Sequence, residues 1–414
     1  MNPLQEIERL VLKQSQEWAL AKLTAELQRQ AEQVEMICPK TGERLSNTRW
    51  RKMKLMTVVG TILHLRVKVG YSQKKRRWFN PIRLQWGLKP YQQVSPELEA
   101  RVCQTATLVP TYNGAVEVAA CWGCAISDDL IHRHVQDLGR KAADLVLPLD
   151  KPAAQEAEFS FVIMMDGWMV RERGPNWGAS RRKKLPDRVV FHEIKSAVIY
   201  RLEKAVKTAG GRGLLLEKHV VATPPETDPV DFGEAVHAEA LRRGLGRAKR
   251  VYVVMDGAVW IWHLAEKRFS QATVILDFHH AREHLMAVAE ALHGDDSAAV
   301  HAWADPLIDQ LLKGQETRVI SQLEELQQDP VLSARAEKVV DRETRYFEEH
   351  RDHIHYQRWK RSGVPRGSGA VESLGLQFQR RFRTCGQFWK RMGLTNLLCL
   401  AVIFKNRDQS FLWN

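Results

Sequence analysis

The sequence predicts an α/β fold for residues 155–410, preceded by a basic region that mixes strands and helices. Short apolar, β-branched runs predict strands, and amphipathic stretches between them predict helices. The segment from about 286 to 361 is rich in Glu, Gln, Ala and Leu and shows no strand pattern, which predicts an all-helical insertion. The expected strands are 159–165, 188–201, 250–255 and 272–276, with helices at 231–244 and 280–293.

The 414 residues carry a formal net charge of +13 that is concentrated in one segment. Residues 40–95 contain 14 Lys and Arg against one acid, Glu43. Such a basic surface attracts a polyanion, because each neutralised phosphate releases condensed counterions. A solvated basic face or attraction to an acidic membrane would also explain the charge.

Composition also indicates where in the cell the protein is located. No apolar run approaches the roughly 18 residues of a membrane span, and the polar start does not resemble a signal peptide, so we expect a cytoplasmic protein. The chain has six cysteines, and we expect no disulfides among them.

Three segments are expected before the linker at 149–155. Residues 1–37 predict a long amphipathic helix, 38–95 a basic β-containing region, and 96–148 a helical region. In the last of these, Ser127 is expected to cap a second helix at 128–138, the spacing of a helix-turn-helix or of an ordinary helical hairpin. Cys121 and Cys124 resemble half a zinc site, but no second pair exists at suitable spacing, so we interpret both as packing residues and do not expect zinc.

Carboxylates follow the predicted strands. Asp166, Asp256 and Asp277 each end an apolar run, and Glu372 lies one turn into a helix that Ser368 is expected to cap. Two close carboxylates repel unless divalent cations lie between them, and oxygen ligands suit Mg²⁺ and Mn²⁺. Two ions roughly 4 Å apart can drive phosphodiester displacement. The alternatives are an ordinary Asp-Gly turn for Asp166 or Asp256 and a surface glutamate for Glu372.

His280 and His284 lie four residues apart on the predicted helix 280–293, a spacing that metal ligands use. A hydrogen-bonding histidine is the more common outcome. We expect Asp277 and His280 to support the acidic site or contact DNA rather than bind zinc.

Four motifs in order resemble bacterial insertion-sequence transposases of the Kra type, which are related to the Mutator group. They are 164–167 (Met-Met-Asp-Gly), 254–262 (Val-Met-Asp-Gly-Ala-Val-Trp-Ile-Trp), 275–285 (Ile-Leu-Asp-Phe-His-His-Ala-Arg-Glu-His-Leu) and 367–373 (Gly-Ser-Gly-Ala-Val-Glu-Ser), followed by 379–386 (Gln-Arg-Arg-Phe-Arg-Thr-Cys-Gly) and Trp389. The resemblance implies an RNase H-like catalytic domain over 155–410 with an Asp-Asp-Glu triad at Asp166, Asp256 and Glu372. It also implies that Asp277 and His280 match the Asp-x-x-His signature beside the active site. Paired cysteines that such proteins often carry near the N-terminus are missing, since Cys38 stands alone.

We therefore expect a DNA transposase that binds terminal inverted repeats and catalyses cleavage and strand transfer with two Mg²⁺, for which Mn²⁺ can substitute. The expected partner is double-stranded DNA, bound by a homodimer or higher oligomer. An RNase H-like nuclease or resolvase without joining, and a domesticated DNA-binding regulator, remain alternatives. The expected DNA contacts are Arg51, Lys52, Lys54, Lys74, Lys75, Arg76, Arg77, Arg380, Arg381 and Arg383.

Overall fold

The computed structural model describes residues 2–180, 184–211 and 213–413. The first residue of the expected N-terminal helix, and residues 181–183 of a basic run, lie outside these ranges. The chain divides into two compact units. Unit 1 contains Met1–Leu145, Cys399–Phe404 and Asp408–Asn414, and unit 2 contains Val146–Leu398 and Lys405–Arg407. The last residues of the chain thus belong with the N-terminal unit, whereas the sequence placed the catalytic domain through residue 410.

Unit 1 opens with helix α1 (Pro3–Gln33), which Asn2 caps by accepting a hydrogen bond from the amide of Leu4. A three-stranded antiparallel sheet follows in the order β1-β2-β3, with β1 at Ser46–Thr57, β2 at Gly60–Ser72 and β3 at Arg77–Phe79. Leucines from the second half of α1 pack against the buried face of this sheet, which includes Leu65 and Val67. This packing leaves the other face of β1 and β2 exposed.

Short helices complete the first unit. They are α2 (Pro81–Gln85), α3 (Pro96–Leu108), α4 (Tyr112–Cys121) and α5 (Asp128–Ala143), and the C-terminal α14 (Arg391–Lys405) contributes residues to both units. Ser127 caps α5 through the amide of Leu130, as its position in the sequence predicts. Small residues of α4 and apolar residues of α5, such as Ala115 and Ile131, are buried.

Unit 2 is built on a five-stranded mixed sheet with the order β10-β9-β4-β5-β8. Strands β9 and β10 run parallel to β4, and β5 runs antiparallel to both β4 and β8. The strands are β4 (Ser160–Arg173), β5 (Val189–Arg201), β8 (His219–Ala222), β9 (Arg250–Met255) and β10 (Thr273–Leu276), and a separate hairpin pairs β6 (Ala205–Lys207) with β7 (Gly213–Leu215). Strand β4 is longer than expected because it continues past Asp166.

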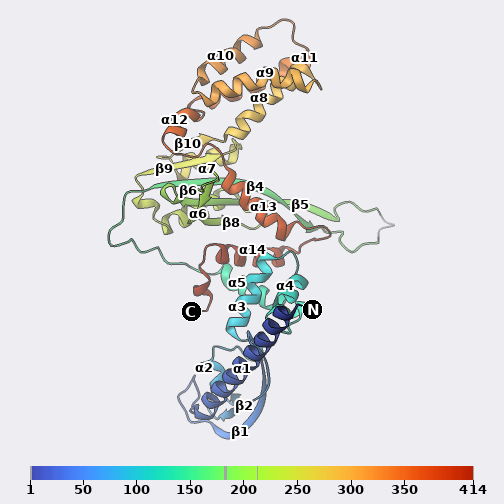
Figure 1. Cartoon of the computed structure of the whole chain (residues 1–414), viewed down its shortest axis with the longest axis vertical. Helices are drawn as coiled ribbons and strands as arrows, with labels where there is room; N and C mark the ends of the chain where they lie inside the picture. The colour runs from blue at the N-terminus through green and yellow to red at the C-terminus, as the bar shows by residue number, and fades with distance from the viewer. Residues whose placement is uncertain (1, 181–183, 212, 414) are drawn as a thin grey trace. The chain divides into compact units, whose positions relative to one another are not determined.

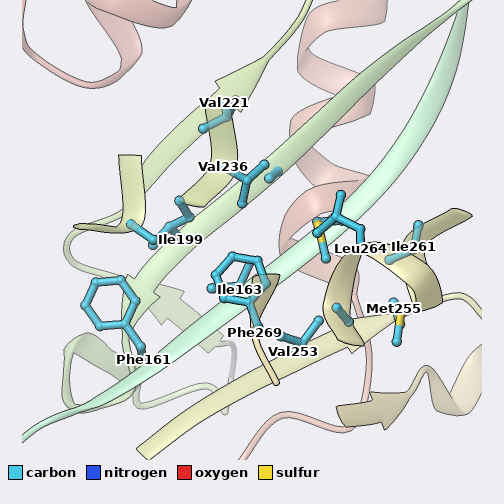
Figure 2. Close-up of a cluster of buried hydrophobic side chains, with 14 of the residues drawn as sticks. Phe161, Ile163, Ile199, Val221, Val236, Val253, Met255, Ile261, Leu264 and Phe269 are labelled. Carbon is cyan, nitrogen blue, oxygen red and sulfur yellow. The ribbon is translucent and has the colours of Figure 1, made fainter. Parts of the chain in front are cut away.

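Helices cover both faces of this sheet. Alternate residues of β4, including Phe161 and Ile163, point into a core with α6 (Pro229–Arg242) and α7 (Val259–Arg268), as Figure 2 shows. Helix α13 (Gly369–Phe382) contacts β4 and β5. There Trp168, whose position in β4 has the opposite parity, stacks on Phe378 of α13. The sheet and α13 can be followed in Figure 1.

Between β10 and α13 the described residues are helical, as the composition predicts. The helices are α8 (Phe278–His293), α9 (Ser297–Leu312), α10 (Glu316–Gln327), α11 (Ala334–Glu349) and α12 (Tyr356–Arg361). Helix α8 packs on α9 and α11 through buried residues such as Leu285 and Val340. Single 3₁₀ turns occur at Leu202–Lys204, Leu245–Arg247, Arg351–His353 and Gln409–Leu412. Within the described ranges, no helix is both long and apolar enough to cross a membrane.

Candidate active site

Strand register brings Asp166 and Asp256 to the same level on neighbouring parallel strands. Met164 of β4 is paired with Val254 of β9, and each aspartate lies two residues further along its strand direction. Because side chains alternate between faces, both aspartates share the parity of Met164 and Val254 and not that of the core residues Ile163 and Val253. Their side chains therefore belong to the face of the sheet that α13 contacts.

Local hydrogen bonds orient these two carboxylates. The amide of Gly167 donates to Oδ1 of Asp166 over 2.7 Å, and the amide of Ala258 donates to Oδ1 of Asp256 over 3.0 Å. Both aspartates are partly exposed. Each carboxylate thus keeps one oxygen free of these turn bonds.

Asp277 follows the next parallel strand and is fully buried. Its amide donates to the carbonyl of Met255 over 2.7 Å, which ties the end of β10 to the residue before Asp256. Its carboxylate accepts from the amide of His279 over 2.5 Å and from both the amide and the hydroxyl of Ser368. Asp277 is therefore a structural acceptor inside the fold, enclosed by its own hydrogen bonds.

Glu372 reaches the site from the first turn of α13. The hydroxyl of Ser368 donates to its Oε1 over 2.7 Å. The sequence predicted that this hydroxyl would cap α13, but Ser368 makes no side-chain capping bond. This expectation was wrong because the hydroxyl lies against Asp277 and Glu372, and no signal in the sequence distinguishes this use of a serine from a cap.

The carboxylates are close enough for their charges to interact. Burial, followed by the charges of Asp256 and Glu372, raises the pKa of Asp166 to about 6, against the opposing effects of the Gly167 amide and His280. A divalent cation among carboxylate oxygens would remove this repulsion. In the described part of the chain, no three His, Cys, Asp or Glu side chains are close enough to form a complete metal site. Asp166, Asp256 and Glu372 offer the oxygen ligands that such a cation prefers. Their side chains would have to move closer together to bind it.

The helical insertion packs directly against the turn after Asp256. Gly257 has a φ of +91°, and a Cβ at this position would lie 2.7 Å from the hydroxyl oxygen of Tyr346 in α11. The ring of Tyr346 stacks on His284 with 3.7 Å between centroids. Its buried hydroxyl has no hydrogen-bond partner among the described residues. Sequence analysis missed Tyr346, since nothing in its local pattern links it to Gly257, 89 positions earlier in the chain.

His280 and His284 of α8 do not share one site. His280 is near enough to affect the pKa of Asp166, and its Nδ1 lies 3.4 Å from Glu283. His284 Nδ1 instead lies 2.5 Å from Oε2 of Glu343, a buried carboxylate in α11. His284 therefore has the expected hydrogen-bonding role, and of these two histidines only His280 affects the pKa of Asp166.

The expected DNA-contact residues divide by exposure. Arg51, Lys52 and Lys54 of β1 and the run 74–77 are exposed, as are Arg380 and Arg383 near the end of α13. Arg381 is only 1% exposed and its guanidinium lies 5.2 Å from the ring centre of Trp389. Arg381 is thus part of the core of unit 2 and not of its surface.

Aromatic and basic side chains interleave along the sheet of β1, β2 and β3. Trp50 pairs across the strands with Lys68, and the cationic groups of Lys68 and Arg66 lie 4.9 and 5.0 Å from its ring centre. Arg49 lies 4.0 Å from the ring centre of Trp78. Stacking rings beside cations suit contact with nucleic acid. Sequence analysis missed strand β1, because basic residues interrupt its apolar positions.

The chain is similar to one described protein family and to a solved structure. The sequence pattern of the protein family described as Uncharacterised protein family (UPF0236) matches residues 2–410. No curated protein matches the chain. Among solved structures, the chain is similar to the Drosophila P element transposase strand transfer complex, with 12% sequence identity, a TM-score of 0.36, and coverage of 80% of this chain and 96% of that one.

Proposed function

This chain belongs to the family described as Uncharacterised protein family (UPF0236), and we propose that it is a DNA transposase with an RNase H-like catalytic domain. The observation that carries the proposal is the register that sets Asp166 level with Asp256, with Glu372 on the helix that contacts the same face. The sheet, in which β5 runs antiparallel to the other four strands, supports that fold.

In this proposal Asp166, Asp256 and Glu372 hold two Mg²⁺ or Mn²⁺. Such ions activate an attacking hydroxyl and stabilise the leaving oxygen in phosphodiester displacement. The chain's own contribution is position: parallel register sets the two aspartates at one level, and a hydrogen bond from the Ser368 hydroxyl orients Glu372. Positioning of the reacting groups and charge stabilisation by the ions would lower the barrier without a covalent enzyme intermediate.

The proposed substrate is double-stranded DNA carrying the ends of a mobile element. The exposed cations of the β1–β2 ribbon and the run 74–77 would contact phosphates, with Trp50 and Trp78 beside them. After cleavage, the 3′-hydroxyl of the element would attack a target phosphodiester at the same acids. Each displacement forms one P–O bond and breaks another, so no further co-reactant is needed.

The test uses linear duplexes that carry the sequences flanking the gene. Asp256→Asn should abolish Mg²⁺-dependent cleavage and strand transfer while DNA binding stays within about twofold. Asp295→Asn, an exposed aspartate in the helical insertion, is the matched control and should retain activity. Strand transfer by the Asp256→Asn protein would remove the triad from the mechanism.

The same assay separates the other two functions. Cleavage without joining of precut ends would indicate a nuclease or resolvase. DNA binding that ignores Mg²⁺ and yields no nicked product would indicate a regulator.

A further inference from the structure

Ser368 differs from the other serines that precede helices in this chain. Ser95, Ser127 and Ser333 each accept a hydrogen bond from the amide three residues later. Ser368 stands at the same position before α13 and makes no such bond. A lost cap costs a helix about 1 kcal/mol, so a serine that leaves its helix uncapped has its hydroxyl engaged elsewhere.

That hydroxyl lies between two carboxylates. It is within hydrogen-bond distance of Oδ2 of Asp277 and lies 2.7 Å from Oε1 of Glu372. One hydroxyl hydrogen can serve one acceptor at a time. Asp277 also accepts from the amides of His279 and Ser368, so it keeps two hydrogen bonds when the hydroxyl donates to Glu372.

Buried residues and backbone hydrogen bonds hold Ser368 in place. Ser368 is 3% exposed and Asp277 is fully buried. The amide of Phe278 donates to the carbonyl of Arg366 over 2.9 Å, which adds a backbone bond between the two segments. Since the amide of Asp277 also bonds to Met255, the support reaches the strand that carries Asp256.

Glu372 itself is exposed. A free glutamate side chain samples several rotamers, and fixing it costs up to about 2 kcal/mol of entropy. We propose that Asp277 and Ser368 form a positioning relay, in which Asp277 holds Ser368 and the Ser368 hydroxyl holds the Glu372 carboxylate towards Asp166 and Asp256. The proposal rests on the proposed function, because it assigns Glu372 to a divalent-cation site.

The relay separates two contributions of Ser368. Its amide holds the fold by bonding to Asp277, and its hydroxyl orients Glu372. Ser368→Ala removes only the hydroxyl, so the variant should fold with the amide bond intact. Residues that orient metal ligands typically change metal affinity about 10-fold to 100-fold when replaced.

The experiment measures Mn²⁺ binding to the full-length protein by titration calorimetry, without DNA. Ser368→Ala should raise the Kd for Mn²⁺ about 10-fold to 100-fold, with an unchanged circular dichroism spectrum at the temperature of the titration. Ser368→Thr keeps the hydroxyl and should recover most of the affinity. Ser373→Ala is the matched control, because Ser373 lies on the same helix and its exposed hydroxyl bonds only to Gln377 among the described residues.

Two negative results have different meanings. If Glu372→Gln weakens Mn²⁺ binding and Ser368→Ala does not, the relay is refuted while the metal site stands. If the wild-type protein binds Mn²⁺ no better than Asp256→Asn, the proposed cation site fails, and the relay fails with it.

Discussion

The carboxylate of Asp277 accepts hydrogen bonds from both the amide and the hydroxyl of Ser368, 91 positions further along the chain. These bonds fasten the two ends of the helical insertion to each other. They also bring the start of α13 beside the ends of β9 and β10. A long insertion is compatible with a fixed site because its two ends are fastened together at the sheet.

We predict that Asp277→Asn destabilises unit 2 by about 2–3 kcal/mol. Both carboxylate oxygens of Asp277 accept from backbone amides, so the NH₂ group of Asn would place a second donor against one of these amide donors. Denaturant unfolding would measure the loss. Asp305→Asn, an exposed aspartate in α9, should change the free energy of unfolding by less than about 0.5 kcal/mol. Equal stability of the Asp277→Asn protein and the wild type would show that the buried bonds contribute little.

Gly257 gives a prediction about the contact between the insertion and the turn after Asp256. Gly257→Ala should lower stability in two ways, by strain at φ +91° and by a clash with the hydroxyl of Tyr346. Backbone strain costs about 1–2 kcal/mol and overpacking about 1–3 kcal/mol. Adding Tyr346→Phe should recover the second part, as a double-mutant cycle of unfolding free energies would measure.

Gly294→Ala is the control for backbone strain, because Gly294 also has a positive φ and has open space around its Cβ position. It should match the residual loss in the double variant. If Tyr346→Phe gives no recovery in Gly257→Ala, the hydroxyl does not limit the space at this turn.

The raised pKa of Asp166 predicts a pH-dependent stability. An acid with a pKa near 6 in the folded state and near 4 when unfolded stabilises the fold in its protonated form. That contribution is complete below about pH 4 and is lost as the pH rises through 6. Asp166→Asn should therefore stabilise the metal-free protein at pH 7.5, by about 1–2 kcal/mol once solvent screening of this partly exposed group is allowed for.

Melting temperatures between pH 4 and 8 would measure this effect. The advantage of Asp166→Asn over the wild type should shrink as the pH falls from 7.5 to 5 and disappear near 4. Asp295→Asn should show no such trend. An advantage that is constant with pH would mean that Asp166 has an ordinary pKa.

The sequence was sufficient for the parts of the site that depend on local pattern. Apolar runs ending in Asp166, Asp256 and Asp277 predict strands, and the structure has a strand that contains Asp166 and strands that end just before Asp256 and Asp277. A strand-free composition likewise predicts the helical insertion. These features are determined within a few residues, so periodicity alone reveals them.

Tertiary packing decided the features that the sequence did not reveal. Ser368 has the local signal of a cap, yet a carboxylate from another part of the chain takes its hydroxyl. Arg381 lies in a basic run like its neighbours, but it faces the core beside Trp389. Tyr346 has no local signal at all. Long-range partners therefore change the roles of residues whose types are easily recognised.

The different exposures of Lys52, Lys54 and Arg381 predict different effects on DNA binding. Each lost phosphate contact reduces the slope of log affinity against log salt by about 1. Replacing both exposed lysines with alanine should reduce the slope by about 2 and leave stability unchanged. Arg381→Ala should leave the slope unchanged and lower stability by about 2–3 kcal/mol, since a buried side chain is removed. Binding of a labelled linear duplex at several salt concentrations would measure the slopes, with Lys13→Ala and Lys22→Ala on the exposed side of α1 as the paired control. If the control pair reduces the slope as much as the β1 pair, the basic charge acts as a diffuse field and not through the exposed face of the ribbon.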